Sequence, residues 1–265
     1  MRRLTMQPEI HPTALIDPSA RIGEGSTVGP YAVIEADVVL GRDCRIAAHS
    51  VIRSRTVLGD EVVMHSFAVI GGEPQDLGFD PAVESRVRIG AGTMIREGVT
   101  LHRSTEAGGE TRIGEHCLLM ANAHAGHDCQ LGDRVILANN VMLGGHVAVG
   151  ARSFLGGGCG VHQFVRIGEL VMVGGNASIT YDVPSYLMVA ERNQVSGLNL
   201  VGLKRNCSSE AIRDLRRCYK GVYLRPGNPA RLAAELSAET PEGRHFLDDF
   251  STGTRGRFVR SRVQS

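Results

Sequence analysis

An aliphatic residue returns every six positions through the first two thirds of this chain. The positions run from Ile10 to Ile70, from Ile89 to Leu101 and from Ile113 to Ile179. They number 26, and 24 of them are Ile, Leu or Val. A period of six fits neither an amphipathic helix nor an ordinary two-sided strand. It fits a short strand followed by a corner, repeated many times.

A second position supports the same register. Four residues after each aliphatic comes a small or β-branched residue, as at Ala14, Ser26 and Cys44. Gly often follows the aliphatic directly, as in Leu131-Gly132, where it would permit a tight corner or a positive φ. Three six-residue units, called hexads here, would close one triangular coil, so the prism would have about nine coils and stand roughly 40 Å tall. We therefore predict an all-β solenoid, a parallel β-helix of hexapeptide repeats.

Composition agrees with a core of many small, similar layers, since the chain has 33 Gly and no Trp. A hydrophobic content of 42% is enough to bury a core. The net charge of +1 gives no electrostatic reason to expect a nucleic acid or an anionic membrane as partner. No apolar run is as long as a membrane span, and Met1–Pro8 lacks the apolar stretch of a secretory signal. We expect a cytoplasmic protein.

Six cysteines are present without a C-x-x-C pair. Four of them occupy the small inward position of a hexad: Cys44, Cys117, Cys129 and Cys159. This pattern favours small buried hydrophobic residues over a metal site or a disulfide framework.

The repeat breaks at 71–88 and again at 104–112, where segments would be ejected from the solenoid. Such loops are where function often lies, although neutral insertions also occur. The pattern ends at 182–184. We therefore divide the chain into a β-helix domain, 1–190, with the ejected loop 71–88, and a small α-helical C-terminal domain, 191–265.

Helix-capping residues support the second domain. Ser208 would cap a helix reaching Tyr219, and Asn228 and Thr240 each precede a proline suited to the first helical turn. The last stretch, 251–265, is polar and is expected to be frayed.

Hexads whose starts differ by 18 residues lie on the same face of successive coils. Three such hexads, 125–130, 143–148 and 161–166, carry or adjoin a strip of polar side chains ~10 Å long. The strip consists of His124, His127, His146, His162 and Gln163. Because the repeat prefers small or apolar residues here, this cluster of titratable groups favours a functional site.

Two chemistries fit a histidine strip on such a prism. The γ-class carbonic anhydrases bind zinc there through three His, two of them in an H-x4-H spacing, and no such pair occurs in this chain. General-base catalysis is the other option, since a neutral imidazole can take a proton from an alcohol. Either Asp128, beside His127, or Asp76, in the ejected loop, would hold the imidazole in one tautomer.

Several motifs narrow the choice of family. They are Ile70-Gly71 with 74–77, the segments 95–103 and 122–129, 137–140, Gly145-His146, 161–164, 182–184 and 197–205. Together they resemble the acyl-carrier-protein–UDP-N-acetylglucosamine O-acyltransferases, the hexapeptide-repeat family that begins lipid A biosynthesis. The resemblance covers the prism and the start of the tail.

The resemblance implies a left-handed coil and a homotrimer with active sites in clefts between neighbouring prisms. His127 would be the general base that deprotonates the glucosamine 3-hydroxyl of UDP-N-acetylglucosamine. That hydroxyl would attack the thioester of a (R)-3-hydroxyacyl chain on acyl carrier protein, with the Gly145 N–H as oxyanion donor. No separate cofactor or metal is implied, because the phosphopantetheine of the carrier bears the acyl group.

The resemblance also implies binding residues. Those matching sugar-nucleotide or acyl contacts are Gln75, Asp76, His124, His146, His162, Gln163, Asn199 and Arg205. Gly175 matches the position that limits acyl-chain length, and a glycine there leaves the groove long. Basic residues of the tail could meet an acidic carrier protein, although they equally fit a solvated helix face: Arg213, Arg216, Arg217 and Lys220.

Three positions depart from the family pattern. Gly78 stands where a lysine is usual, Val201 where a glutamate is usual, and Asn206 where a second arginine is usual. The loss of the lysine removes a point charge suited to a diphosphate or an acyl carbonyl. The acceptor could therefore be UDP-N-acetylglucosamine or its 3-amino analogue, and the acyl-chain length stays open.

Other members of the superfamily remain as alternatives. The later N-acyltransferase of lipid A synthesis carries an extra N-terminal domain, whereas here the repeat begins by Ile10. A CoA-dependent acetyltransferase would not need the Gln75-Asp76 loop or the long tail. A purely structural prism would give no reason for the histidine strip.

Overall fold

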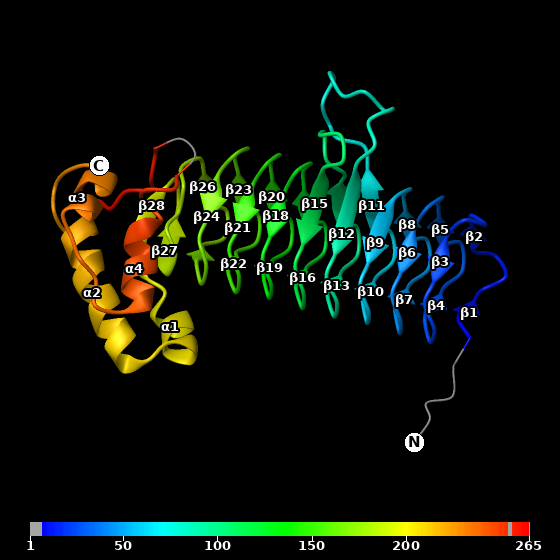
Figure 1. The fold of residues 1–265 in the computed structure, drawn as a ribbon, viewed down its shortest axis with the longest axis horizontal. Helices are drawn as coiled ribbons and strands as arrows, with labels where there is room; N and C mark the ends of the chain where they lie inside the picture. Colours follow the sequence, from blue (N-terminus) through cyan, green and yellow to red (C-terminus); the bar gives the residue numbers. More distant parts are fainter. Residues whose placement is uncertain (1–6, 254–255, 265) are drawn as a thin grey trace.

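The computed structural model describes residues 7–253 and 256–264. Figure 1 shows an elongated prism of short strands with a compact group of helices at its C-terminal end. The strands form three sheets, named A, B and C here, and the chain passes through A, B and C in turn before returning to A one coil further on. The prism is therefore a parallel β-helix with a triangular coil.

Every one of the 26 hexad positions predicted from the sequence lies in a strand, β1 to β26. Sheet A contains β1 (Glu9–Ile10), β4 (Thr27–Val28), β7 (Arg45–Ile46), β10 (Val63–Met64), β13 (Met94–Ile95), β16 (Leu118–Leu119), β19 (Ile136–Leu137), β22 (Phe154–Leu155), β25 (Met172–Val173), β27 (Leu187–Ala190) and β28 (Gln194–Leu198). Sheet B contains β2 (Leu15–Ile16), β5 (Val33–Ile34), β8 (Val51–Ile52), β11 (Val69–Gly72), β14 (Thr100–His102), β17 (His124–Ala125), β20 (Met142–Leu143), β23 (Gly160–Val161) and β26 (Ser178–Ile179). Sheet C contains β3 (Arg21–Ile22), β6 (Val39–Leu40), β9 (Thr56–Leu58), β12 (Arg86–Ile89), β15 (Glu110–Ile113), β18 (Gln130–Leu131), β21 (Ala148–Val149) and β24 (Arg166–Ile167).

Neighbouring strands of a sheet pair in parallel, with partners 18 residues apart in the regular coils, as for Thr27 and Arg45. The aliphatic residue of each hexad points inward, so that Ile46 and Leu137 are 2% and 0% exposed. The small position is also buried, including all four cysteines assigned to it. The core is thus a stack of similar layers, as the repeat predicts.

The corners show where the repeat strains the backbone. In most coils the residue three positions after the aliphatic has a left-handed φ, as at Asp43 (56°) and Asp128 (62°). Asp, Asn and His tolerate this conformation better than most side chains. Of the two roles expected for the glycine directly after the aliphatic, the positive φ occurs at Gly71 (83°), whereas at most such glycines the missing side chain allows a close approach between coils. At Gly132 a Cβ would lie 2.8 Å from the Ala151 nitrogen, so this glycine allows two coils to approach, and it has no positive φ.

Two insertions lengthen single coils without interrupting the pairing. Val69 pairs with Thr100 across the first insertion, and Thr100 pairs with His124 across the second. The first insertion leaves between β11 and β12, and the second between β14 and β15. Both therefore depart from the corner between sheets B and C, and Figure 1 shows the first one projecting well beyond the prism.

Beyond the last coil, β27 and β28 form an antiparallel hairpin on the end of sheet A, and the predicted domain boundary at residue 190 falls within it. The described helices are α1 (Leu200–Asn206), α2 (Ser209–Tyr223), α3 (Pro229–Ala234) and α4 (Pro241–Asp248). The predicted caps Ser208, Asn228 and Thr240 are confirmed, because each side chain accepts a hydrogen bond from the first turn of its helix. The sequence reasoning did not predict α1.

The frayed C-terminal end that we expected is wrong for residues 256–264. Val259 is 0% exposed and Phe258 is 5% exposed. The Val259 N–H donates to the carbonyl oxygen of Asp182 at 3.0 Å. Residues 1–6, 254–255 and 265, which include most of the N-terminal segment, lie outside the described part of the chain. No helix in the described part has the length and apolar character needed to cross a membrane.

Replacing an inward aliphatic should cost much more stability than replacing its outward neighbour. Leu40 is 2% exposed within β6. We expect Leu40→Ala to lower the free energy of unfolding by about 2–5 kcal/mol, because it leaves a cavity in the stack. Val39→Ala on the outer face of the same strand should cost about 0.5 kcal/mol or less. Urea unfolding followed by circular dichroism measures both, and equal losses would contradict the inward assignment.

Candidate active site

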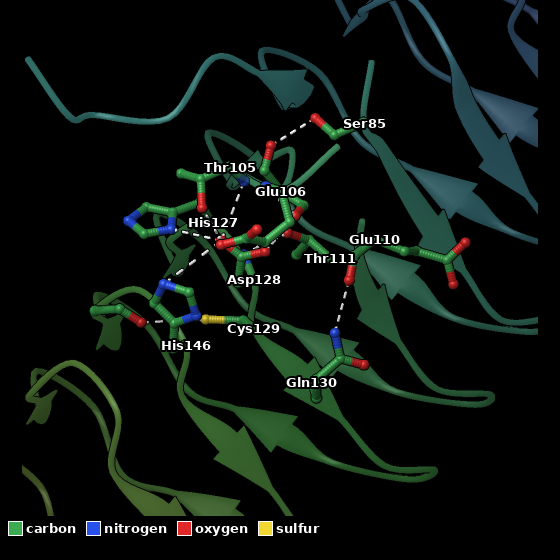
Figure 2. A network of polar contacts seen from close by, with 12 residues as sticks. Ser85, Thr105, Glu106, Glu110, Thr111, His127, Asp128, Cys129, Gln130 and His146 are labelled. Atoms are coloured by element: carbon green, nitrogen blue, oxygen red, sulfur yellow. Dashed lines mark hydrogen bonds and ion pairs between the residues drawn. The ribbon is translucent and has the colours of Figure 1, made fainter. Parts of the chain in front are cut away.

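The predicted polar strip lies on sheet B and on the corner that follows its strands. β17, β20 and β23 are neighbours in this sheet. Their register places Gly145 one coil beyond His127, and His146 one coil beyond Asp128. Figure 2 shows His127, Asp128 and His146 turned toward one another at this corner.

The imidazole of His127 is held by its sequence neighbour. Nδ1 of His127 lies 2.8 Å from Oδ2 of Asp128. With the proton on Nδ1, Nε2 is left as a proton acceptor. Of the two carboxylates that the sequence left open, the structure therefore brings Asp128 to the histidine. In the described part of the chain, Asp76 instead accepts a hydrogen bond from the Gly78 N–H at 2.8 Å.

The carboxylate of Asp128 accepts hydrogen bonds from the second insertion as well. Thr105 donates to Oδ2 from its backbone nitrogen at 3.1 Å and from Oγ1 at 2.7 Å, and Ser104 Oγ donates to Oδ1. Burial raises the pKa of Asp128, but the hydrogen bonds from Ser104, His127 and Thr105 outweigh it and hold that pKa below its usual value. Asp128 is thus ionised at neutral pH, the form that accepts the Nδ1 proton.

Gly145 faces the free edge of the His127 ring. A Cβ on Gly145 would lie 2.5 Å from Nε2 of His127, so only glycine leaves this space open. A Cβ on Gly126 would lie 2.9 Å from the Gly145 nitrogen, so a second glycine keeps that nitrogen uncovered. Within the described residues, no backbone group accepts a hydrogen bond from the Gly145 N–H. A proton acceptor and an unused N–H donor therefore lie side by side.

His146 completes one wall of this corner. Its Nε2 lies 3.7 Å from Oδ2 of Asp128, and its ring meets that of His127 edge-on at 5.0 Å. The ring of Phe164, one coil further on, stacks on His146 at 4.4 Å. The aromatic stack limits the orientations that His146 can adopt.

The structure adds His102, which the sequence reasoning did not select. Its ring lies edge-on to that of His124 at 5.0 Å, and within the described residues its buried Nδ1 has no hydrogen-bond partner. Burial lowers the pKa of His102 to about 4, with smaller contributions from His124 and His127. Allowing for the length of the second insertion would have identified His102, because β14, which contains it, pairs with β17, which contains His124.

His124 faces a groove on the outer surface of sheet B. Its Nδ1 lies 2.8 Å from Thr100 Oγ1, and burial lowers its pKa. The groove has a volume of about 350 Å³, and its lining includes Met142, Gly160 and His162. Met142 is 55% exposed. The groove therefore offers an apolar surface between imidazoles, beside the corner that carries His127.

Other predicted residues lie apart from this corner in a single chain. Gln75 and Asp76 are exposed on the first insertion. Asn199 caps α1 and donates to the Leu170 carbonyl oxygen at 2.8 Å. Arg205 is exposed on the same helix, and Gly175 is exposed on the corner between sheets A and B.

A metal ion is the alternative use of this cluster. One ligand atom each from His127, Asp128 and His146 lies within 4.8 Å of the others. The structure uses these atoms differently, because Nδ1 of His127 and Oδ2 of Asp128 share a hydrogen bond and Thr105 also donates to that oxygen. A metal would have to displace the Nδ1 proton and these hydrogen bonds. The donor set is arranged as a hydrogen-bonded acid–base pair.

Comparisons with known proteins indicate one family over more than nine tenths of the chain. Hexapeptide-repeat transferase models match residues 19–54, 110–145 and 146–181, and a model described as domain 2 of UDP-N-acetylglucosamine O-acyltransferase matches residues 182–258. An acyl-[acyl-carrier-protein]–UDP-N-acetylglucosamine O-acyltransferase from Chlorobaculum parvum is 50% identical, covering 94% of this chain and 96% of that protein. This chain belongs to the UDP-N-acetylglucosamine O-acyltransferase family.

Further relatives support this family assignment. An enzyme of the same name from Halorhodospira halophila is 45% identical, covering 93% of this chain and 98% of that protein. The solved structure of LpxA from Acinetobacter baumannii superposes with a TM-score of 0.90 at 36% identity, covering 95% of this chain and 99% of that one.

The three departures from the family pattern are all at the surface. Gly78 lies on the exposed first insertion. Val201 is 63% exposed on α1, and Asn206 ends that helix with its Nδ2 donating to the Gly202 carbonyl oxygen at 2.8 Å. None of them touches His127, Asp128 or Gly145 in the described chain, so the departures leave the acid–base pair of this family member intact.

His102 should remain neutral well below the usual pH of histidine titration. We expect its NMR titration midpoint at about pH 4, with His102→Gln used to assign the resonance. Between about pH 4 and the unfolded value near 6.5, the unfolded chain binds the extra proton, so stability is lost as pH falls through this window. The wild type should therefore lose more stability than His102→Gln between pH 7 and pH 5. A midpoint near 6.5 would contradict this.

Proposed function

We propose that this protein transfers a (R)-3-hydroxyacyl chain from acyl carrier protein to the glucosamine 3-hydroxyl of UDP-N-acetylglucosamine, the first step of lipid A biosynthesis. The observation that carries the proposal is the pairing of His127 Nε2 with the uncovered N–H of Gly145. Membership of the family supplies the reaction class, because its named relatives are enzymes of this kind.

The arrangement of His127, Asp128 and Gly145 supports both proton transfers of the reaction. With its Nδ1 proton held by Asp128, His127 takes the proton of the 3-hydroxyl on Nε2 as the oxygen attacks the thioester carbonyl. The carbonyl oxygen becomes an oxyanion, which the Gly145 N–H stabilises. When the intermediate collapses, the carbon–sulfur bond breaks, and the imidazolium returns its proton to the departing phosphopantetheine thiolate. The ionised Asp128 stabilises the imidazolium between these steps.

The groove beside His127 has the character that an acyl chain and a sugar require. Met142 supplies an apolar surface, while His124 and His162 supply donors at its edges. Gln163 follows in register after Gly145, so it lies two coils beyond His127 on the same corner. Gly175 would leave the far end of the groove open for a long chain.

We infer that the protein acts as a homotrimer, because two of its three faces are apolar. The outward residues of sheet B include Leu15 and Met142, which are 67% and 55% exposed. Those of sheet A include Met94 and Met172, which are 38% and 36% exposed. The outward residues of sheet C are mainly polar: Arg21, Arg88, Arg112, Gln130 and Arg166. Exposed apolar surface of this extent indicates an interface.

The corner between sheets A and B would lie nearest the threefold axis. It carries a ladder of stacked rings, with Tyr31 and His49 5.2 Å apart and His49 and Phe67 5.3 Å apart. Tyr31 and Phe67 are 58% and 64% exposed. In a cyclic trimer, sheet A of one copy faces sheet B of the next. The groove on sheet B would then be closed by the neighbouring prism.

Leu77, within the first insertion, is fully exposed in a single chain. An apolar side chain in this position fits a loop that rests on another copy. Gln75 and Asp76 would thereby reach a sugar bound in the cleft between two prisms.

The tail offers a surface for the acidic carrier protein. The side chains of Arg213, Arg216 and Lys220 are exposed on α2. Arg217 forms an ion pair with Asp214, with its Nη2 2.5 Å from Oδ1. A row of three cations on one helix face suits an acidic partner.

Two further features belong to the proposal. The coil is left-handed, contrary to the general rule for parallel crossovers, and the match to hexapeptide-repeat models supports this. The protein works in the cytoplasm, and the presence of six free cysteines supports this because such thiols suit a reducing compartment.

A direct assay tests the activity. Purified protein is mixed with radiolabelled UDP-N-acetylglucosamine and a panel of 3-hydroxyacyl carrier proteins. We expect product with one preferred chain length, none above background with His127→Ala, and a loss of roughly 100-fold or more in kcat with Gly145→Ala, since the added methyl would meet His127.

The 3-amino analogue serves as a second acceptor in the same assay. Activity on the analogue alone would assign the departures at Gly78, Val201 and Asn206 to acceptor choice. Absence of product with both acceptors, from a folded protein of unchanged oligomeric state, would refute the proposed function.

Charge placed on the ladder corner should disrupt the trimer. We expect Phe67→Asp to yield smaller species in analytical ultracentrifugation, because three carboxylates would meet near the axis. Val57→Asp, on the outer face of sheet C, is the matched control and should remain trimeric. A wild-type monomer, or equal effects of the two substitutions, would contradict this arrangement.

A further inference from the structure

Ser104 links the first insertion to the acid–base pair. Its hydroxyl donates to Oδ1 of Asp128 and accepts a hydrogen bond from the Glu106 N–H at 3.0 Å. Its carbonyl oxygen accepts a hydrogen bond from Ser85 Oγ at 2.5 Å. Ser104 is 0% exposed and Ser85 is 2% exposed. Buried polar groups with all these bonds made are costly to rearrange, so Ser104 is held in one position.

Arg103 extends the link into the loop. Its guanidinium donates to the carbonyl oxygens of Pro81 and Val83, and to Ser85 Oγ at 3.2 Å. The side chain is 9% exposed. A planar arginine holds several acceptors in fixed directions at once. The base of the first insertion is therefore anchored to the residue that precedes Ser104.

The two carboxylate oxygens of Asp128 have different tasks. Oδ2 accepts from His127 Nδ1 and from Thr105, whereas Oδ1 accepts from Ser104. Rotation of the carboxyl group would carry Oδ2 away from the imidazole, and the bond to Oδ1 opposes that rotation. The Asp128 N–H also donates to Thr111 Oγ1 at 2.7 Å, which holds the backbone of this corner. Figure 2 shows this network around Asp128.

We propose that Ser104 is a positioning residue for acyl transfer. Through Asp128 it holds the imidazole of His127 toward the acceptor hydroxyl, and through Ser85 it ties that orientation to the first insertion. The inference rests on the proposed function and deepens it. One hydrogen-bonded unit thus fixes both the loop that would contact the sugar and the orientation of the His127 imidazole. Ser104 joins the two, and it lies outside both the hexapeptide repeat and the histidine strip.

The first test compares Ser104→Ala with Ser54→Ala. Ser54 is a matched control, because its Oγ also donates to a carboxylate, Glu35 Oε2 at 3.2 Å, away from the acid–base pair. Removing a residue that orients a functional group through a second residue typically costs 10- to 100-fold. We expect Ser104→Ala to lower kcat by about this factor, with the KM for the sugar nucleotide changed less than about threefold. Ser54→Ala should stay within about twofold of wild type in both constants.

A second variant keeps the test decisive if Ser104→Ala does not fold. Thr105→Val removes the Oγ1 hydrogen bond to Asp128 Oδ2 and retains the one from the Thr105 nitrogen. It should also lower kcat with little change in KM. Circular dichroism and ultracentrifugation confirm that each variant is folded and assembled as the wild type.

The link between Ser104 and the first insertion is tested by a double-mutant cycle that combines Ser104→Ala with Ser85→Ala. If the two serines act as one unit, the loss in kcat of the double variant will be smaller than the product of the two single losses. Strictly multiplicative losses would overturn the tie to the loop.

The outcomes separate this inference from the proposed function. If Ser104→Ala and Thr105→Val both retain wild-type kcat while His127→Ala is inactive, the positioning role is overturned and the acyltransferase stands. If the wild type makes no product with either acceptor, the proposed function itself has failed.

Discussion

Parallel pairing at an 18-residue register is the constraint on which the rest of this protein depends. Most strands contain only two residues, too few to be stable alone, so each coil gains its stability from the coils on either side. The same register converts sequence distance into position. Gly145 stands beside His127, and His146 beside Asp128, because each pair is separated by one coil. The active corner is therefore a product of the repeat.

The site residues occupy positions at which the hexapeptide repeat does not require a particular side chain. The corner position with a left-handed φ accepts Asp128 and His146, and the tight approach between coils leaves Gly145 without a side chain facing the His127 ring. The rigid stack holds these groups in fixed relative positions, so little further conformational freedom is lost when they act together. The two insertions then add what the repeat lacks: donors for Asp128 and a loop beyond the prism.

The periodicity predicted all of β1 to β26 and placed the histidine strip correctly on one face, because both depend on local spacing. It missed His102 and did not foresee Ser104 or Thr105 as partners of Asp128, because the second insertion changes the spacing to the next coil. α1 was missed because it is a seven-residue helix. The polar C-terminal segment was expected to fray, yet it contains Phe258 and Val259, which pack beside Asp182.

The sequence by itself determined the β-helix and the faces of its coils, because a hexad records its own inward and outward positions. Its motifs indicated the family, and the resemblance to that family supplied His127 as the candidate base. Only the tertiary structure decided that Asp128 rather than Asp76 holds His127, and that Ser104 and Thr105 hold Asp128. The physical reason is that hydrogen bonds formed across an insertion depend on how a loop closes onto the rest of the chain. Loop closure is governed by long-range packing, which no local period encodes.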